Sequence, residues 1–271
     1  MIDALVEMFS YRFMVRAGVV GLLVSLCAAL LGVCLVLKRY SMIGDGLSHV
    51  GFGALAVASA LGLAPMAVAV PVVVVAAFLL LRLSSRGKLK GDAMIAMIST
   101  AALAVGVLVS SLSSGFKNDV YNYMFGSLYG ISAGDVWLSV ALSSVVIALF
   151  LLFFHRIFAV TYDEIHAQAT GVNVRFYHFM ISFLTAVTVV LGMRMMGAML
   201  ISSFIIFPAM TARRLARSFK GMIFAAAGIS LLSFACGMAA SYLFDLPTGA
   251  SVVCASLLFL LLSLPKRAKG T

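Results

Sequence analysis

Long runs of hydrophobic residues, separated by short polar segments, make up most of the chain. Each run is about 17–24 residues long, and a helix needs about 20 apolar residues to cross the hydrocarbon core of a bilayer. The pattern predicts about nine transmembrane helices, or eight if the sixth and seventh runs, which only Met193 and Arg194 separate, form one. The predicted spans are Ala17–Leu37, Leu47–Leu63, Pro65–Leu81, Ala93–Leu112, Ala133–Phe154, Phe176–Gly192, Met195–Thr211, Gly221–Leu243 and Gly249–Leu264. We therefore expect an all-α polytopic membrane protein.

Composition supports this class, because 63% of the 271 residues are hydrophobic and only 10% are charged. The net charge is +10, but Lys and Arg form short clusters at the ends of the apolar runs, where the positive-inside rule places them in the cytoplasm. They form no stripe interleaved with aromatic residues, so a nucleic-acid partner is not expected. With nine spans, the clusters alternate correctly for an external N-terminus and a cytoplasmic C-terminus. The cytoplasmic clusters are Lys38/Arg39, Arg82/Arg86/Lys88/Lys90, Arg156, Arg213/Arg214/Arg217/Lys220 and Lys266/Arg267/Lys269.

The chain is expected to form a single transmembrane domain over residues 1–271. Residues 1–16 lack the basic segment and cleavage site of a signal peptide, and we expect an interfacial lead-in there. Residues 113–132 are a longer external connection, whose aromatic side chains suit a helix at headgroup level.

A second long connection, residues 158–174, is predicted to lie in the cytoplasm. Asp163 and Glu164 stand at the start of a short helical stretch and Gly171 at its end, as helix capping prefers. A short, capped polar helix between two spans is suited to docking on a cytoplasmic partner.

An acid and a histidine occur inside one apolar run, in segment 41–53. Asp45 and His49 are four residues apart, so in a helix they lie one turn apart on the same face. Ionisable groups within a membrane span are costly, and their default interpretation is functional. Carboxylate and neutral imidazole are ordinary zinc ligands, and the pair supplies two of the usual four. The sequence therefore predicts a passage site for a divalent transition metal; the alternative is a helix-start acid beside a histidine satisfied by a neighbouring hydroxyl.

Other potential ligands have simpler interpretations. The four cysteines lie inside apolar runs with no CxxC spacing and are expected to be buried hydrophobes. His155, His166 and His178 lie beside predicted cytoplasmic ends and are expected to be solvated or snorkelling residues, the less favoured alternative being a regulatory metal contact. The methionines lack the clustered pattern of a copper pathway and are expected to pack in the core.

Several ordered segments resemble the motifs of the zinc/manganese-type ABC importer permeases. The first, residues 38–49, reads KRYSMIGDGLSH and contains the predicted metal pair. The others are residues 162–172, residues 197–213, which contain a Pro-Ala-x-x-Ala turn, and residues 245–249. Residues 123–127, YMFGS, resemble the zinc-type members more closely. The chain departs from the family after the histidine, where many relatives have Leu-Pro-Gly or Leu-x-Gly and this chain has Val-Gly-Phe-Gly.

The resemblance implies a metal-type ABC permease fold in the bacterial inner membrane, a homodimeric pore, two cytoplasmic ATPase subunits and an external metal-binding solute protein. It implies that Zn²⁺ or Mn²⁺ is cargo passing Asp45 and His49, with no permanently bound cofactor. The residues it assigns to ATPase coupling are Asp163, Glu164, Ala169 and Gly171, and the structural motif residues are Gly44, Ser48, Gly197, Pro208, Pro247 and Gly249. A two-fold dimer could join two Asp–His pairs into a four-coordinate site.

The chain has no Walker A motif and no Ser/His/Asp or His-Glu-x-x-His constellation, so it is not expected to be an enzyme. We therefore interpret it as the pore subunit of an ATP-driven importer, with zinc favoured over manganese. One alternative is an ion-gradient-driven secondary cation transporter, which would take up metal without a partner ATPase. A less favoured alternative is an intramembrane metalloenzyme, which would hold stoichiometric metal and show hydrolytic activity.

Overall fold

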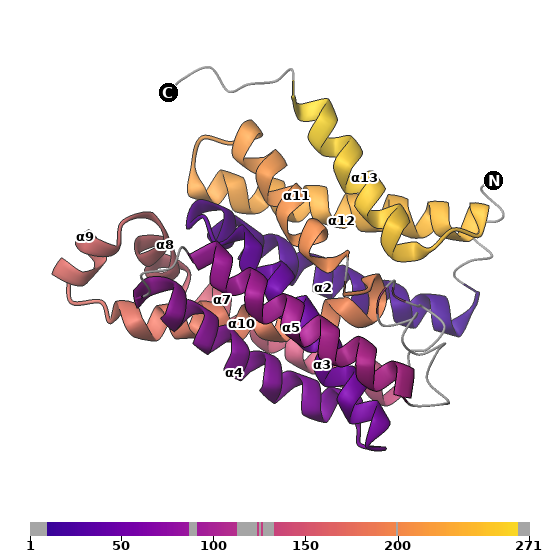
Figure 1. The fold of residues 1–271 in the computed structure, drawn as a ribbon. Helices are drawn as coiled ribbons and strands as arrows, with labels where there is room; N and C mark the ends of the chain where they lie inside the picture. The colour runs from indigo at the N-terminus through magenta and orange to yellow at the C-terminus, as the bar shows by residue number, and fades with distance from the viewer. Residues whose placement is uncertain are drawn as a thin grey trace.

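The chain is all-α in a computed structural model that describes residues 10–86, 91–112, 124, 126, 133–198 and 200–264. Its long helices pack into one bundle, from which a short helix, α9, projects at one end (Figure 1). The helices are α2 (Arg12–Leu37), α3 (Ser41–Ala60), α4 (Pro65–Arg86), α5 (Gly91–Leu112), α7 (Ala133–Leu152), α8 (Phe154–Tyr162), α9 (Glu164–Ala169), α10 (Val174–Met196), α11 (Ile201–Leu215), α12 (Phe219–Phe244) and α13 (Thr248–Ser263). The described residues contain no strand, which confirms the predicted fold class.

A helix lies along each predicted hydrophobic run. By length and composition, α2, α5, α10 and α12 could each cross a membrane, and α7 with α8, bent by 72° at their junction, would form a fifth span. Helix α11 has 15 residues and extends about 22 Å, less than the roughly 30 Å hydrocarbon core of a bilayer. The number of membrane crossings therefore stays a prediction.

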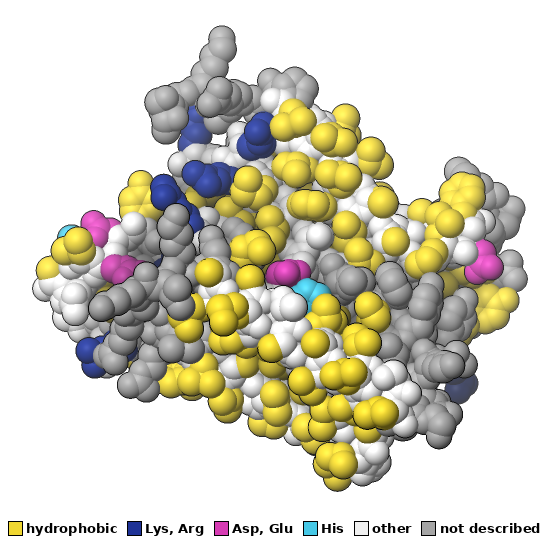
Figure 2. Space-filling view, viewed as in Figure 1, with side chains coloured by type: hydrophobic (Ala, Val, Ile, Leu, Met, Phe, Trp, Pro, Cys, Tyr) yellow, Lys and Arg dark blue, Asp and Glu magenta, His cyan; other side chains and the backbone are white. Residues whose placement is uncertain are grey.

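Hydrophobic side chains cover much of the surface seen in Figure 2, as expected for a lipid-facing protein. Most of the Lys and Arg side chains visible in that view lie on its left half, toward the end from which α8 and α9 project. This distribution agrees with the predicted cytoplasmic position of that end.

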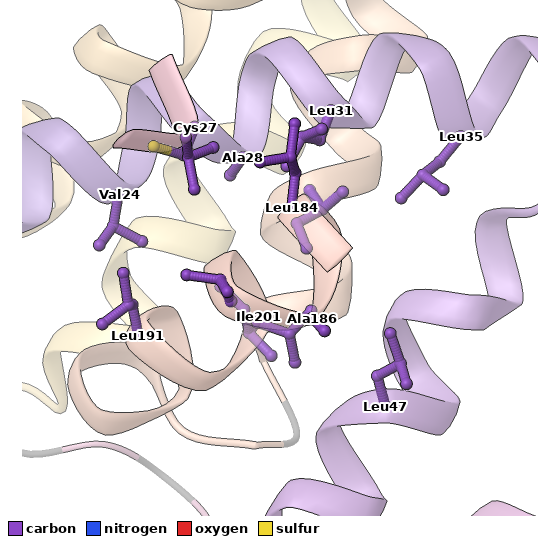
Figure 3. Packing of buried hydrophobic residues seen from close by; sticks show 14 of the residues in the cluster. Val24, Cys27, Ala28, Leu31, Leu35, Leu47, Leu184, Ala186, Leu191 and Ile201 are labelled. Atoms are coloured by element: carbon purple, nitrogen blue, oxygen red, sulfur yellow. The ribbon is translucent and has the colours of Figure 1, made fainter. Parts of the chain in front are cut away.

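The core is built around α2 and α10, most of whose residues are buried. Side chains from both helices meet between them, and Ile201 at the start of α11 joins them (Figure 3). Within a membrane, close van der Waals packing holds helices together because lipid is as apolar as the core. Such packing brings α11 against α2, where a Cβ atom on Gly32 would lie 2.3 Å from the carbonyl oxygen of Ile205.

The predicted boundary between the sixth and seventh runs is wrong by several residues, because α10 continues through Arg194 to Met196. Gly197 then ends the helix with a φ of 87°, a conformation that favours glycine. Gly249, in the first turn of α13, packs against this break. A Cβ atom there would lie 2.2 Å from the carbonyl oxygen of Met196, so only glycine fits. Helix α13 can therefore pack directly on the end of α10.

At the start of the chain, residues 12–16, which the sequence places in an interfacial lead-in, are helical and belong to α2. Residues 1–9 and nearly all of connection 113–132, which is predicted to be external, lie outside the described residues, and so does most of segment 123–127.

Candidate functional site

Helix α3 begins at Ser41 and carries the predicted metal pair within its first three turns. Nε2 of His49 lies 3.7 Å from Oδ2 of Asp45, as their i, i+4 spacing requires. The His49 side chain is 16% exposed and that of Asp45 is 37% exposed, so the pair is open on one side. Nδ1 of His49 is buried and has no hydrogen-bond partner among the described residues.

A third side chain reaches the pair from a distant part of the chain. The hydroxyl of Ser202 donates a hydrogen bond to Oδ1 of Asp45 at 3.3 Å. Ser202 is nearly buried in the first turn of α11, directly after the break that follows Gly197. An anionic side chain is favoured near the N-terminus of a helix, whose unpaired N–H groups carry partial positive charge. Asp45 therefore turns one oxygen toward α11 and the other toward His49.

The glycine and serine of the motif have packing roles. Gly44 faces α11, where a Cβ atom would lie 4.0 Å from Cα and Cβ of Ser202. The buried hydroxyl of Ser48 donates to the carbonyl oxygen of Asp45 at 2.8 Å. Neither residue presents a further ligand toward the pair, and both belong to the contact between α3 and its neighbours.

The remaining motif residues shape the ends of helices. Pro208 lies inside α11, while Pro247 is the residue before α13 and has a φ of −58°. Gly197 ends α10 with a positive φ, and Gly249 lets the start of α13 approach the carbonyl of Met196 at the end of α10. This arrangement places the first turn of α11, rather than its middle, beside Asp45.

The site lies well away from the basic residues that end α11. Ser202 precedes Arg213, in the last turn of α11, by about three helical turns, or about 16 Å along the helix axis. Figure 2 shows an acidic and a histidine side chain side by side on a face that is otherwise largely hydrophobic.

The geometry suits a partial metal site. Two ligands of one tetrahedral zinc ion are separated by about 3.3 Å when each metal–ligand bond is about 2.05 Å. The 3.7 Å between the histidine nitrogen and the carboxylate oxygen needs only a small rotamer adjustment to reach this value. Among the described residues, no group of three or more His, Cys, Asp or Glu side chains could hold a metal ion. One chain therefore offers two strong ligands at this place.

Segment 158–174 contains the predicted capped helix. The carboxylate of Asp163 accepts a hydrogen bond from the backbone N–H of His166 at 2.9 Å and so caps the start of α9. At the other end, after Ala169, Gly171 has a φ of 80°, and the backbone N–H groups of Gly171 and Val172 bond to the carbonyls of Gln168 and Ala167. This is the Schellman arrangement that a left-handed glycine permits.

The outer face of α9 is exposed and carries one large apolar side chain among polar ones. Ile165 is 82% exposed, and Tyr162, just before the helix, is 75% exposed. Large apolar side chains at the projecting end of the molecule suit contact with another protein.

Glu164 points the other way, into the protein. Its Oε1 accepts a hydrogen bond from Nζ of Lys38 at 2.6 Å and lies 3.1 Å from Nε2 of His178. The Lys38 side chain is 5% exposed. His178 lies against Lys38 and Glu164, and its side chain is 23% exposed.

Burial and charge act in opposite directions at this cluster. Burial lowers the pKa of Lys38, although its hydrogen bond with Glu164 and the charge of that residue oppose the change. For Glu164, burial alone would raise the pKa, but the hydrogen bond and charge of Lys38, together with His178, outweigh it and leave the pKa below its ordinary value. Burial, and then the charge of Glu164, raises the pKa of Tyr40. The carboxylate of Glu164 is thus held in its ionised form.

Sequence reasoning missed Ser202, Lys38 as a partner of Glu164, and His178. Ser202 is one of many serines inside apolar runs, and nothing in its neighbourhood marks it as a partner of Asp45. Lys38 was assigned to a basic cluster at a helix end. A single sequence carries no signal that would have joined it to an acid 126 residues away.

The sequence is similar to known membrane transport proteins over most of its length. A model of the ABC 3 transport family matches residues 10–266. The high-affinity zinc uptake system membrane protein ZnuB of Haemophilus influenzae is 31% identical over 260 residues, which cover 96% of this chain and 99% of that protein. The manganese transport system membrane protein MntC of Halalkalibacterium halodurans is 27% identical over 256 residues, covering 94% of this chain and 88% of the relative.

A solved structure is also similar over nearly the whole chain. The structure of PsaBC from Streptococcus pneumoniae in complex with Fab matches with a TM-score of 0.88 and 26% identity. The match covers 97% of this chain and 95% of that one. The likeness therefore extends to the arrangement of α3, α10 and α11 as well as to the helical class.

Proposed function

The chain belongs to the ABC 3 transport family, and we propose that it forms the pore of an ATP-driven importer that prefers zinc to manganese. It is a permease subunit of the zinc/manganese type and an integral membrane protein of the bacterial inner membrane. It is not an enzyme, and the ATPase of such a transporter is a separate subunit. The proposal concerns the path of the metal, its identity and the assembly.

The observation that carries this proposal is the pair formed by Asp45 and His49 on α3, 3.7 Å apart and open on one side. A metal ion delivered by an external solute-binding protein would bind between the carboxylate and the imidazole. Two ligands from one chain hold a divalent metal less firmly than a complete four-ligand site. Incomplete coordination suits transport because the ion must also leave.

A homodimer would bring two such pairs together around its two-fold axis. Two carboxylate oxygens and two imidazole nitrogens would then complete a four-coordinate site, shared by the subunits. The coupling segment from Asp163 to Gly171 would meet the ATPase, with the exposed Ile165 of α9 as the main contact. ATP binding and hydrolysis would then open the shared site alternately to the two sides of the membrane.

The preference for zinc rests on the resemblance of segment 123–127 to the zinc-type members. Mixed nitrogen and oxygen ligands are compatible with both metals, so uptake measurements must decide between them.

The test is uptake of radiolabelled zinc and manganese into proteoliposomes that contain this chain with its ATPase and binding protein. We expect uptake that requires ATP hydrolysis, that persists when ionophores abolish the proton and sodium gradients, and that is faster for zinc. Uptake by this chain alone, driven by an ion gradient, would contradict the proposal and favour a secondary transporter. Faster uptake of manganese than of zinc would be consistent with an ATP-driven importer but would contradict the proposed preference for zinc.

A further inference from the structure

Three side chains from separate segments meet at the projecting end of the molecule. Nζ of Lys38 lies 2.6 Å from Oε1 of Glu164 and 3.3 Å from Nε2 of His178, and the last two atoms are 3.1 Å apart. Lys38 is the residue that ends α2, Glu164 opens α9, and His178 lies in the second turn of α10. The cluster therefore joins the coupling helix to two central helices of the bundle.

The burial of Lys38 makes this contact specific. A lysine whose side chain is only 5% exposed needs an acidic partner, because an unpaired charge is costly away from water. Glu164 supplies that partner, although its own side chain is half exposed. Helix α9 otherwise packs mainly on α8 and α10, so this ion pair is its link to α2.

Lys38 also stands at the base of the helix that carries the metal pair. After Lys38, Arg39 adopts a left-handed conformation with a φ of 60°, and α3 begins at Ser41. The backbone N–H groups of Arg39 and Tyr40 bond to carbonyls in the last turns of α2, which makes the connection short and tight. A displacement at Lys38 would thus reach α3 within three residues and Asp45 within seven.

We propose that Lys38 and His178 are positioning residues that tie the coupling helix α9, through Glu164, to the base of α3. Movement of α9 against the ATPase is then transmitted through the ion pair to the turn at residues 38–40, and from there to Asp45 and His49. The inference rests on the proposed function for the identity of the metal site. It gives Glu164 a role inside the permease, whereas contact with the ATPase is left to the exposed face of α9.

The test compares variants of the assembled transporter in proteoliposomes and measures ATP hydrolysis and metal uptake in the same samples. The variants are Glu164→Gln, Lys38→Met, the charge exchange Lys38→Glu with Glu164→Lys, and Arg175→Met as a matched control. Arg175 is an exposed cation in the first turn of α10. Radiolabelled zinc and manganese are the probes.

We expect Glu164→Gln and Lys38→Met to keep ATP hydrolysis while uptake per ATP falls on the order of fivefold, as for the loss of a coupled charged contact. The charge exchange should restore part of the metal uptake per ATP hydrolysed, and Arg175→Met should match the unmodified chain in this ratio. A merely structural role would reduce the amount of assembled transporter and leave uptake per ATP unchanged.

Two results would overturn the inference. One is a Glu164→Gln variant whose metal uptake per ATP is unchanged. The other is a charge-exchange variant that assembles but whose uptake per ATP is as low as that of the single variants. If Lys38→Met does not assemble, Glu164→Gln decides alone, since it keeps the shape of a half-exposed side chain. Failure of the unmodified transporter to accumulate either metal would contradict the proposed function instead.

Discussion

Ser202 and Asp45 are joined by a hydrogen bond of 3.3 Å that links the first turn of α11 to the metal pair on α3. The bond occupies Oδ1 of the carboxylate and leaves Oδ2 facing the imidazole of His49. A broken span whose new helix starts beside an ionisable residue is a common arrangement at transport sites in membranes. The carboxylate is thus oriented by a residue that would not itself bind the metal firmly.

Replacing Ser202 by alanine should therefore weaken metal binding without blocking the pore. A hydrogen bond to a charged group contributes about 1.5–3 kcal/mol when buried and less at a partly exposed carboxylate. We expect the KM for metal uptake to rise about three- to tenfold while the maximal rate stays within about twofold. The adjacent variant Ser203→Ala is the control. Equal KM values for the two variants would show that the bond does not orient Asp45.

A glycine substitution tests the packing at the break between α10 and α11. In Gly249→Ala the new Cβ atom would lie 2.2 Å from the carbonyl oxygen of Met196, so the helices must move apart. We expect a loss of about 1–3 kcal/mol, seen as a lower melting temperature of the purified protein. Gly228→Ala in α12 is the control, because a Cβ atom there meets nothing within 4 Å. That change should be neutral or raise stability by about 0.5–1 kcal/mol. Equal melting temperatures for the two variants would contradict the close approach.

The end of the coupling helix offers a second backbone test. Gly171 has a φ of 80° with open space around it, so Gly171→Ala should cost about 1–2 kcal/mol of local stability through strain alone. Uptake per ATP should fall, and Gly171→Asn should lose less because asparagine tolerates this conformation. Combined with Glu164→Gln, Gly171→Ala should uncouple hydrolysis from uptake without preventing assembly. Full transport by that double variant would refute the role of the segment.

The ion pair at Glu164 should make stability depend on pH in acid. The pKa of Glu164 lies below its ordinary 4.5: burial raises it, but Lys38 and His178 outweigh burial. A lowered pKa in the folded state means that the stabilisation is complete above pH 4.5 and is lost as the pH falls through the folded value. The unmodified protein should melt higher than Glu164→Gln at about pH 5, and the gap should close toward about pH 3. A gap that stays constant over this interval would contradict the ionised pair.

The helices could largely be predicted from hydrophobic runs. A membrane span must satisfy its backbone hydrogen bonds internally, so it is a helix, and its length makes the apolar run recognisable in the sequence. The boundary after Met196 could not, since Arg194 looked like a break and the actual terminator, Gly197, followed only three residues later. The first helix likewise begins before the predicted span and includes Arg12 and Arg16 at its exposed end, where long cationic side chains can reach the headgroups.

In the candidate site, too, contacts between residues close in sequence could be predicted, and contacts between distant residues could not. The i, i+4 spacing of Asp45 and His49 was enough to predict that they face each other. Contacts between distant segments could not be predicted in this way. Ser202 lies 157 residues away from its partner Asp45, and Lys38 lies 126 residues away from its partner Glu164. These contacts arise from how α11 and α9 pack, which one sequence does not reveal.

The most direct test of the account is metal uptake by Asp45→Ala and His49→Ala at matched expression, in vesicles that contain the ATPase and the binding protein. His155→Ala, which removes an exposed histidine from α8, is the control. The account predicts that both site variants lose ATP-dependent uptake while His155→Ala retains it, because each removes one of two ligands that this chain supplies. Uptake that is unchanged in both site variants would make Asp45 and His49 structural residues and place the metal path elsewhere in the bundle.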